Sequence, residues 1–408
     1  MTETERKSQL AVIFVTVFIY LLGFGIVIPI LPLLSQDFGA TAVQTGLLLS
    51  VYSLMQFIFA PLWGRLSDRW GRRKILLGCL LGEALTYILF AFSTDLSTLF
   101  IARALAGFFG ASLSTASAAI SDITTADQRS KGMALIGAAF GLGFLFGPAI
   151  GGLLSLWGQH LSPEPGYATR FTMLWVAGIC FVTFLFGARF LIETLSPDQR
   201  APKKAGRWAL LGASFAKPTV GPLMAVFFLA SFAMSSMEAN LVLYMRERFD
   251  WGIREVSFGF AYIGIVMVLT QGVLVRRLLP KLGERTVLRS GLLLFSLGLL
   301  GIALAQNLTG MAVTMTLLAL GNGLSNPSIL GSISLLTSGR EQGSTLGSTQ
   351  SLASLGRILG PAFGGFLFER IFVQAPFIAG ALLGAAALGI VFWLGLRVPT
   401  AAKKEMNA

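Results

Sequence analysis

Long apolar runs constrain the fold of this chain more than any other feature of its sequence. A helix of about 20 residues crosses the roughly 30 Å hydrocarbon core of a bilayer, whereas a transmembrane β-strand needs only about ten residues of alternating polarity. The runs have the helical length, so we predict an all-α integral membrane protein with twelve transmembrane helices. The predicted spans are 10–34, 42–62, 75–94, 97–120, 132–156, 172–192, 219–244, 256–275, 287–305, 308–335, 344–367 and 374–396.

Charge supports this class and orients the chain. Only 12% of the residues are charged, about half the share found in soluble domains. The net charge of +12 does not indicate nucleic-acid binding, because 24 of the 31 Lys and Arg residues lie at the chain ends or in connections on the same side as them, against five on the other side. Cations collect on the cytoplasmic side of membrane proteins, so both termini are expected there.

The sequence contains an internal repeat. Residues 142–152 match residues 355–365 in the second half of the chain, and a short basic segment at 64–74, which we expect to form a turn between two spans, has a fainter copy at 276–288. A polar, basic connection at 194–218 separates the two sets. We therefore predict two parallel six-helix repeats, with an N-terminal bundle at 1–193, a cytoplasmic linker at 194–218 and a C-terminal bundle at 219–408.

Small residues line one face of the fifth span. Gly143, Gly147 and Gly151 recur every four residues, and Gly152 follows. Pro148 removes a backbone donor and bends a helix. The pattern fits close helix packing, a hinge, or both.

Few charged residues lie inside the spans. Glu83 and Glu238 are carboxylates, and Arg103 is a cation beside the small residues Gly107 and Gly110. Charges in hydrocarbon are costly and mark functional sites, unless the acids form local hydrogen-bonded pairs or Arg103 anchors its helix by extending to the membrane surface. Because burial favours the neutral form of a carboxylic acid, the two glutamates are candidate proton carriers, with Arg103 as coupling partner.

A second group of polar residues could line a substrate cavity. Arg357 stands where the first repeat has Phe144. This asymmetry suggests that Arg357 binds an anionic group or pairs with a carboxylate of the protein. Few polar groups in a Phe- and Met-rich interior suit an amphiphilic substrate better than a sugar. The candidate cavity residues are Gln56, Asn240, Gln271, Asn322, Asn326, Gln350 and Arg357.

Metal and nucleotide chemistry lack sequence support. Cys79 and Cys180 lie in apolar runs, and the single histidine, His160, lies in a connection, so no metal-ligand spacing is present. No phosphate-binding glycine loop ending in Lys-Ser/Thr is found. We expect no enzymatic activity and no cofactor, with a proton gradient as the energy source.

Four motifs are informative together: Leu22-Gly23 with Pro29 and Pro32, residues 64–74, Arg103 with Gly107, and the glycines with Pro148 in the fifth span. They resemble motifs of the Major Facilitator Superfamily, specifically its twelve-helix drug/proton antiporters related to tetracycline exporters. The glycine motif with Pro148 is associated in that superfamily with export by antiport. The resemblance implies alternating access in the bacterial inner membrane.

The resemblance also implies a latch between the halves on the cytoplasmic side. Its residues here would be Gly64, Asp68, Gly71, Arg72 and Asp122. Asp68 would face the start of the eleventh span near Ser344, and Arg72 would pair with Asp122. The plain alternative is a positive-inside anchor, which does not account for Asp68.

The chain departs from the tetracycline exporters at two acidic positions. Those proteins carry acids where Tyr20 and Thr86 stand here, with Glu83 one turn before Thr86. We therefore predict a monomeric proton-coupled exporter of amphiphilic drug-like molecules, with a small-molecule substrate, protons and the lipid bilayer as partners and no nucleic acid. The alternatives are a proton-coupled exporter of a native sugar, amino acid or siderophore, and a non-transporting membrane receptor.

Overall fold

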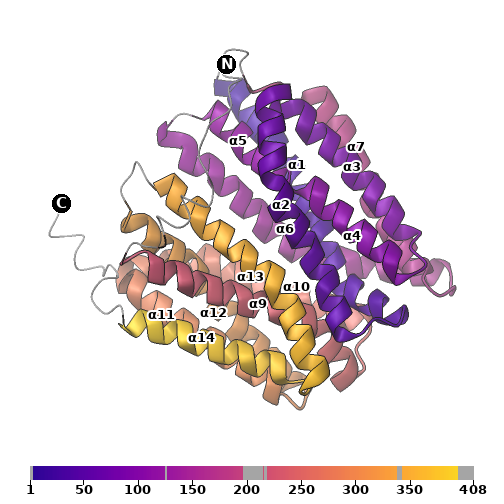
Figure 1. The fold of residues 1–408 in the computed structure, drawn as a ribbon, viewed down its shortest axis with the longest axis vertical. Coiled ribbons are helices and arrows are strands. Elements are labelled where there is room, and N and C mark those ends of the chain that lie inside the picture. The colour runs from indigo at the N-terminus through magenta and orange to yellow at the C-terminus, as the bar shows by residue number, and fades with distance from the viewer. Residues whose placement is uncertain (1–2, 125, 196–214, 216–217, 338–341, 394–408) are drawn as a thin grey trace. The chain divides into compact units, whose positions relative to one another are not determined.

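The computed structural model describes residues 3–124, 126–195, 215, 218–337 and 342–393. Figure 1 labels its helices. The predicted linker at 194–218 lies almost entirely outside these residues. The helices are α1 (Glu3–Asp37), α2 (Ala42–Trp70), α3 (Arg72–Ala91), α4 (Leu96–Gly110), α5 (Leu113–Ile123), α6 (Ala126–Leu161), α7 (Tyr167–Phe190), α9 (Gly221–Phe249), α10 (Ile253–Leu269), η2 (Thr270–Leu274), α11 (Val275–Leu304), α12 (Leu308–Leu335), α13 (Gln342–Arg370) and α14 (Ala375–Trp393).

The described helices account for the predicted membrane crossings. Eleven helical segments in this part of the chain are long and apolar enough to span a bilayer. One of them, Ile253–Leu304, has 52 residues, and at 1.5 Å per residue it is more than twice as long as the hydrocarbon core is thick. It leaves helical geometry at Gly283 (φ 75°, ψ 160°). This segment therefore supplies two of the twelve predicted spans.

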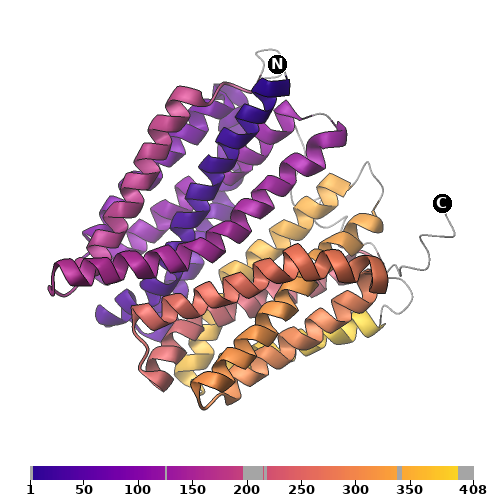
Figure 2. The same cartoon turned by 180° about the vertical axis from the view of Figure 1, so that it is seen from behind.

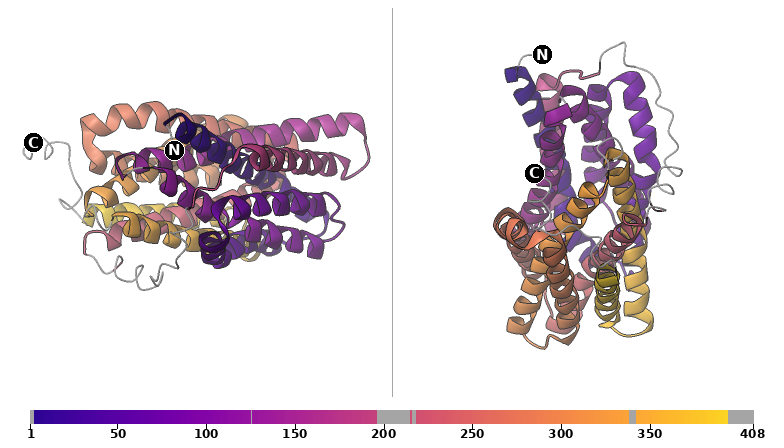
Figure 3. Two further views of the ribbon diagram at one scale, coloured as in Figure 1. Left: turned by 90° about the horizontal axis from the view of Figure 1, so that it is seen from above. Right: turned by 90° about the vertical axis from the view of Figure 1, so that its left-hand side faces the viewer.

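The chain forms two compact units. Unit 1 comprises Met1–Ala40, Val51–Lys203 and Met245–Ala261, and unit 2 comprises Thr41–Ser50, Lys204–Tyr244 and Tyr262–Ala408. In unit 1, α1 packs against α6, and α3 packs against α4 and α7 (Figure 2). In unit 2, α11 packs against α12 and α14. Figure 3 shows the helices from above and from one side. Each unit is thus a helix bundle.

Each bundle has an apolar core. The core of unit 1 includes Ile13, Leu21 and Ile120, which are at most 3% exposed. The core of unit 2 includes Leu223, Leu292 and Ile329, all fully buried. Most of the long helices have apolar residues on all sides and show almost no amphipathic period. Their buried face could therefore not be predicted from hydrophobicity alone.

The predicted turn at 64–74 was wrong in length. Helix α2 continues to Trp70 and α3 begins at Arg72, so Gly71 (φ 100°, ψ 149°) alone separates them. Charged residues end a membrane crossing but do not end a helix, since Arg, Ser and Asp all tolerate helical backbone. Gly71 does end it, because its φ is readily adopted only by glycine.

The repeat extends to backbone detail. Gly283 lies in the same unusual backbone region as Gly71, its counterpart in the first half of the chain. Asp95 caps α4 by accepting a hydrogen bond from Thr98 N, and Asn307, at the matched position of the second half, caps α12 by accepting one from Gly310 N. Both caps satisfy an N–H that the helix leaves unpaired.

Two local features differ from the sequence expectation. The predicted fourth span at 97–120 is divided into α4 and α5 by a turn at Ala111 and Ser112. A π-helical turn, η2, interrupts the eighth span. Such turns are often found at functional sites, and the hydrophobic pattern carries no signal for them.

Candidate functional site

One end of unit 1 carries a charged cluster that joins three helices. We call this end, where α1 begins, the N-terminal face. Gln9 Nε2 of α1 donates to Phe190 O of α7 over 3.0 Å, so the end of α7 lies there as well. Just beyond α7, the Glu193 carboxylate accepts from Arg72 N (2.8 Å) and Arg73 N (3.3 Å). Glu193 therefore caps the positive N-terminus of α3.

Arg72 brings the expected latch residues together within unit 1. It is 7% exposed, and its Nε lies 3.1 Å from Asp122 Oδ2. The same guanidinium forms an ion pair with Asp68 and donates to Ser67 Oγ over 2.6 Å. Two carboxylates thus hold one buried cation at the start of α3. The expected approach of Asp68 to Ser344 falls on a side chain outside those the structure describes.

The remaining latch residue, Gly64, lies within α2. A Cβ at Gly64 would meet no described atom within 4 Å, whereas a Cβ at Gly71 would collide with the Glu193 carboxylate. The two glycines of this segment therefore have different surroundings in unit 1. Only Gly71 is required by the packing that the structure describes.

A second cluster of polar side chains lies deep in unit 1. Glu83 of α3 and Arg103 of α4 are each 2% exposed, and each lies within electrostatic reach of the other. Neither Glu83 oxygen accepts a hydrogen bond from a described residue, and Arg103 Nε has no described acceptor. The structure therefore places the two predicted coupling residues, Glu83 and Arg103, in one buried site. The described interactions include no ion pair between them.

Tyrosines connect this site to α1 and α2. The guanidinium carbon of Arg103 lies 4.5 Å from the centroid of the Tyr52 ring, a cation–π contact. The Tyr52 hydroxyl hydrogen-bonds the Tyr20 hydroxyl. Gln56 Nε2 donates to Tyr20 Oη and to Gly110 O, each over 3.2 Å. Gln56 therefore belongs to the Glu83–Arg103 site of unit 1.

The small residues of α4 make room for these tyrosines. A Cβ at Gly110 would collide with the Tyr20 hydroxyl, and a Cβ at Gly107 would collide with Tyr52 O. The spacing of Gly107 and Gly110 after Arg103 thus lets α1 and α2 approach α4 closely. This explains physically why the cation and the two glycines occur together.

Sequence reasoning did not assign a role to the tyrosines or to Glu193. The chain has only six tyrosines, and three of them, Tyr20, Tyr52 and Tyr87, are at most 7% exposed around Glu83. A buried tyrosine needs a partner for its hydroxyl, so three tyrosines in the first three spans were an available signal. Glu193 had no such signal, because capping depends on tertiary geometry.

Unit 2 contains a second acid and cation in the membrane-spanning region. Glu238 of α9 lies within electrostatic reach of Arg357 of α13, and both are half-buried. Arg357 also donates from Nη2 to Ser354 Oγ over 3.0 Å. Each unit thus holds one carboxylate and one arginine in reach of each other on neighbouring spans.

The other candidate cavity residues of unit 2 are distributed unevenly. Asn240 is 1% exposed, and its Nδ2 donates to Ser236 O over 2.8 Å. Asn322 is 9% exposed, and Asn326 is half-buried. Gln271, in η2, and Gln350, in α13, are exposed. No described contact joins these side chains into one cluster.

The glycine motif packs helix against helix in both units. Gly147 lies against Gly25 of α1, and Gly143 and Gly151 lie against Leu21 and Ile26. In unit 2, Gly360 and Gly364 of α13 lie against Ser236 of α9. Pro148 lies inside α6, and Gly152 beside it is buried. The repeat therefore preserves the contact between the first and fifth spans of each half.

The described residues contain no group of three or more His, Cys, Asp and Glu side chains that could hold a metal ion.

Comparison with known families gives matches over most of the chain. The model of the Major Facilitator Superfamily matches residues 13–282 and 269–407. The class H tetracycline resistance protein of Pasteurella multocida is 30% identical over 367 residues, which cover 89% of this chain and 90% of that protein. Multidrug resistance protein 2 of Bacillus subtilis is 26% identical over 392 residues, 95% of each.

Solved structures give the same result. The human organic anion transporter MFSD10 (TETRAN) matches with a TM-score of 0.70 at 26% identity, covering 96% of this chain and 100% of that chain. A bacterial homologue of the human lysosomal transporter Spinster matches with a TM-score of 0.73 at 15% identity, covering 98% of this chain and 96% of that chain. These matches confirm the fold and the resemblance that the sequence predicted.

Proposed function

The chain belongs to the Major Facilitator Superfamily, a family of small-molecule transporters rather than enzymes, and we propose that it is a proton-coupled antiporter exporting amphiphilic drug-like molecules. One observation carries this proposal. Glu83 is buried in unit 1 with no described hydrogen-bond donor to either oxygen, within electrostatic reach of Arg103.

This arrangement suits a proton carrier. A buried carboxylate anion without hydrogen bonds is costly, and a proton removes that charge. When the proton leaves, Arg103 offers the anion a cation on the neighbouring helix. Glu83 can therefore exist in two charge states, neutral when it carries a proton and anionic when Arg103 stabilises it, as antiport requires.

Glu238 and Arg357 form the corresponding candidate pair in unit 2. The two acids do not occupy matched positions of the repeat, since Phe295 is the counterpart of Glu83 in the second half and Ile26 is the counterpart of Glu238 in the first. We propose that either or both carry the proton. Asn240, Gln271, Asn322, Asn326 and Gln350 remain candidate substrate contacts, with Gln56.

We propose that the N-terminal face of unit 1 is cytoplasmic, in a bacterial inner membrane with both chain ends on that side. The excess of Lys and Arg in the connections of this side supports the orientation. The Asp68–Arg72–Asp122 cluster then lies at the cytoplasmic surface, where a latch would control access from inside the cell. The two bundles at 1–193 and 219–408 would be the moving parts.

The names of the relatives support an organic, drug-like substrate, because the matched proteins are tetracycline and multidrug resistance proteins. The alternative is export of a native sugar, amino acid or siderophore. Tyr20 and Thr86 keep this alternative open, because the tetracycline exporters that the sequence resembles have acids at these two positions.

Transport by purified protein in lipid vesicles with an acidic interior tests the proposal. We expect a lipophilic cation dye to accumulate inside as protons leave, and a protonophore to abolish the accumulation. Accumulation of polar metabolites in place of the dye would favour the alternative. A dye distribution that does not depend on the proton gradient would contradict antiport. Absence of any ligand-dependent change in cysteine accessibility on the two faces would favour a receptor.

A further inference from the structure

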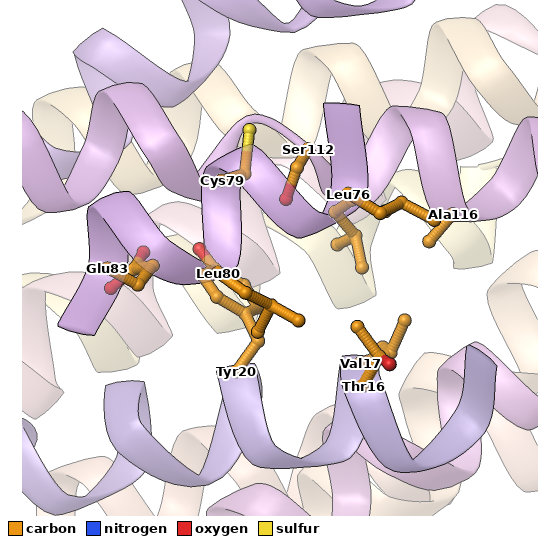
Figure 4. Close-up of a pocket in the computed structure, with 10 residues that line it drawn as sticks. Thr16, Val17, Tyr20, Leu76, Cys79, Leu80, Glu83, Ser112 and Ala116 are labelled. Atoms are coloured by element: carbon orange, nitrogen blue, oxygen red, sulfur yellow. The ribbon is translucent and has the colours of Figure 1, made fainter. Parts of the chain in front are cut away.

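A small cavity lies next to Glu83 on the side of the N-terminal face. Its volume is about 20 Å³, room for one water molecule. Helices α1, α3 and α5 line it together with Ser112, which precedes α5. Figure 4 shows Glu83 at one end of the group, with Thr16, Val17 and Ala116 at the other.

The lining of the cavity divides into two chemical classes. Apolar side chains from α1, α3 and α5 form half of the wall. Water in such a cavity needs between two and four polar partners. The polar lining residues are Thr16, Tyr20, Cys79, Glu83 and Ser112.

The hydroxyls of the lining can take part in a relay. Thr16 Oγ1 donates to Val12 O over 2.9 Å, and its oxygen can still accept a hydrogen bond. Ser112 Oγ interacts with the Cys79 thiol. Thr16 precedes Tyr20 on α1 by one turn, so it lies closer to the N-terminal face. A water between Glu83 and these hydroxyls would extend the polar path from the carboxylate toward that face.

We propose that this cavity is the proton-exchange site of Glu83, in which one water molecule links the carboxyl group to Thr16 and Ser112; the inference rests on the proposed antiport. When Glu83 releases its proton, the carboxyl O–H bond breaks and the water oxygen gains the proton. The hydronium ion that results donates hydrogen bonds to the Thr16 and Ser112 hydroxyl oxygens, so the water holds the proton and the Glu83 anion remains beside it.

Groups on α1, α3, α4 and α7 contribute to the electrostatic surroundings of Glu83. Arg103 of α4 stabilises the anion, and Tyr52 of α2 lies over that guanidinium. The remaining titratable groups are neutral hydroxyls and thiols, so Arg103 supplies the described positive charge that faces the relay. The groups in electrostatic reach of Glu83 are Tyr20, Cys79, Tyr87, Arg103 and Cys180.

The apolar wall explains how exchange could be restricted to one site. A cavity of about 20 Å³ has room for one water molecule and none for a hydrated cation beside it. Val17, Leu76 and Ala116 of the wall belong to the packed core of unit 1. The cavity is thus enclosed by that core and is too small for a large organic substrate.

The test replaces the hydroxyls and keeps the side-chain shapes. Thr16→Val and Ser112→Ala each remove one hydrogen-bonding group. We expect each to slow the hydrogen–deuterium exchange of the Glu83 carboxyl group about tenfold. Difference infrared spectroscopy of the full chain in lipid measures this exchange. The Glu83→Gln variant identifies the carboxyl band.

Two matched controls keep the outcome interpretable. Thr16→Ser retains the hydroxyl and should exchange at the wild-type rate. Thr86→Val removes a buried hydroxyl that bonds Gly82 O on the same helix as Glu83 but does not line the cavity, and it should also leave exchange unchanged.

The possible results separate the two proposals. Wild-type exchange in both Thr16→Val and Ser112→Ala would overturn the relay, whether or not the protein transports. Equal slowing in Thr86→Val would overturn it as well, because the effect would then be structural. Slowed exchange in the two variants, together with no substrate-driven proton release by the wild type, would contradict the proposed function and leave the exchange site standing.

Discussion

Gly71 shows how one residue determines the local geometry of the N-terminal face. Its φ of 100° is a conformation that side chains with a Cβ rarely adopt, and the Glu193 carboxylate fills the space where a Cβ would be. That carboxylate is held by two backbone N–H groups of α3. The turn, the helix cap and the position of Arg72 therefore depend on one another.

Gly71→Ala should destabilise the protein by about 1–3 kcal/mol through backbone strain and displacement of Glu193. A matched control is Gly78→Ala, because Gly78 lies inside α3 and a Cβ there meets no described atom within 4 Å. The control should be neutral or slightly stabilising. Thermal unfolding of both variants in detergent measures the difference, and equal midpoints would contradict the geometry.

Asp95 gives a pH-dependent prediction outside the membrane spans. Thr98 N donates to the carboxylate over 2.9 Å, and the Thr98 hydroxyl donates over 2.8 Å. These hydrogen bonds, the backbone one first, hold the pKa of Asp95 below its ordinary value. The stabilisation is therefore present above the pKa of the unfolded chain, about 3.9, and disappears as the pH falls through the lower pKa of the folded state.

Asp95→Asn should keep a helix cap, as Asn307 does at the matched position, but lose this titration. Between about pH 5 and pH 3, the thermal midpoint of the wild type should fall more than that of the variant. The other carboxylates titrate equally in both proteins, so the difference isolates Asp95. Parallel pH profiles would show that the cap contributes no charge-dependent stability.

At the scale of helices, the repeat is the part of the fold that sequence reasoning predicted best. A nearly constant offset along the chain relates the glycine motifs of α6 and α13, the glycines at 71 and 283, and the caps at 95 and 307. The number and order of spans followed from run length and charge. These features are local in sequence, so a single chain reveals them.

Helix ends and partners could not be predicted in the same way. The length of α2 was wrong because polar residues tolerate a helix beyond the membrane surface, and η2 has no pattern in the hydrophobicity. Arg72 and Asp122 were paired from the resemblance, but Glu193 as the cap of α3 was not foreseen. Contacts between distant segments depend on packing, which a sequence pattern does not contain.

The packing of α1 on α6 provides a test at this scale. A Cβ at Gly147 would lie 2.6 Å from the Gly25 Cα, so Gly147→Ala requires the two helices to separate. We expect a loss of about 1–3 kcal/mol. Gly141→Ala, in the same helix, meets no described atom within 4 Å and should not destabilise. Equal folded yields and midpoints for the two variants would contradict close packing as the reason for the motif.

At the scale of the whole molecule, the cluster around Arg72 is where the proposed latch can be tested. Asp68 holds Arg72 together with Asp122, and its loss leaves the cation partly uncompensated. Asp68→Asn should lower transport while expression and topology stay intact. Arg69→Gln, which changes an exposed cation in the same segment, is the control. Normal transport by Asp68→Asn would return the segment to the role of a positive-inside anchor.

The central claim is that carboxylates inside the two bundles couple proton movement to transport. Substrate-driven proton release from vesicles containing the wild type, Glu83→Gln and Glu238→Gln tests it most directly, with the exposed Glu164→Gln as control. We predict that the control releases protons as the wild type does, and that at least one of the two buried-site variants binds substrate but releases none. Wild-type release by both Glu83→Gln and Glu238→Gln would contradict the claim.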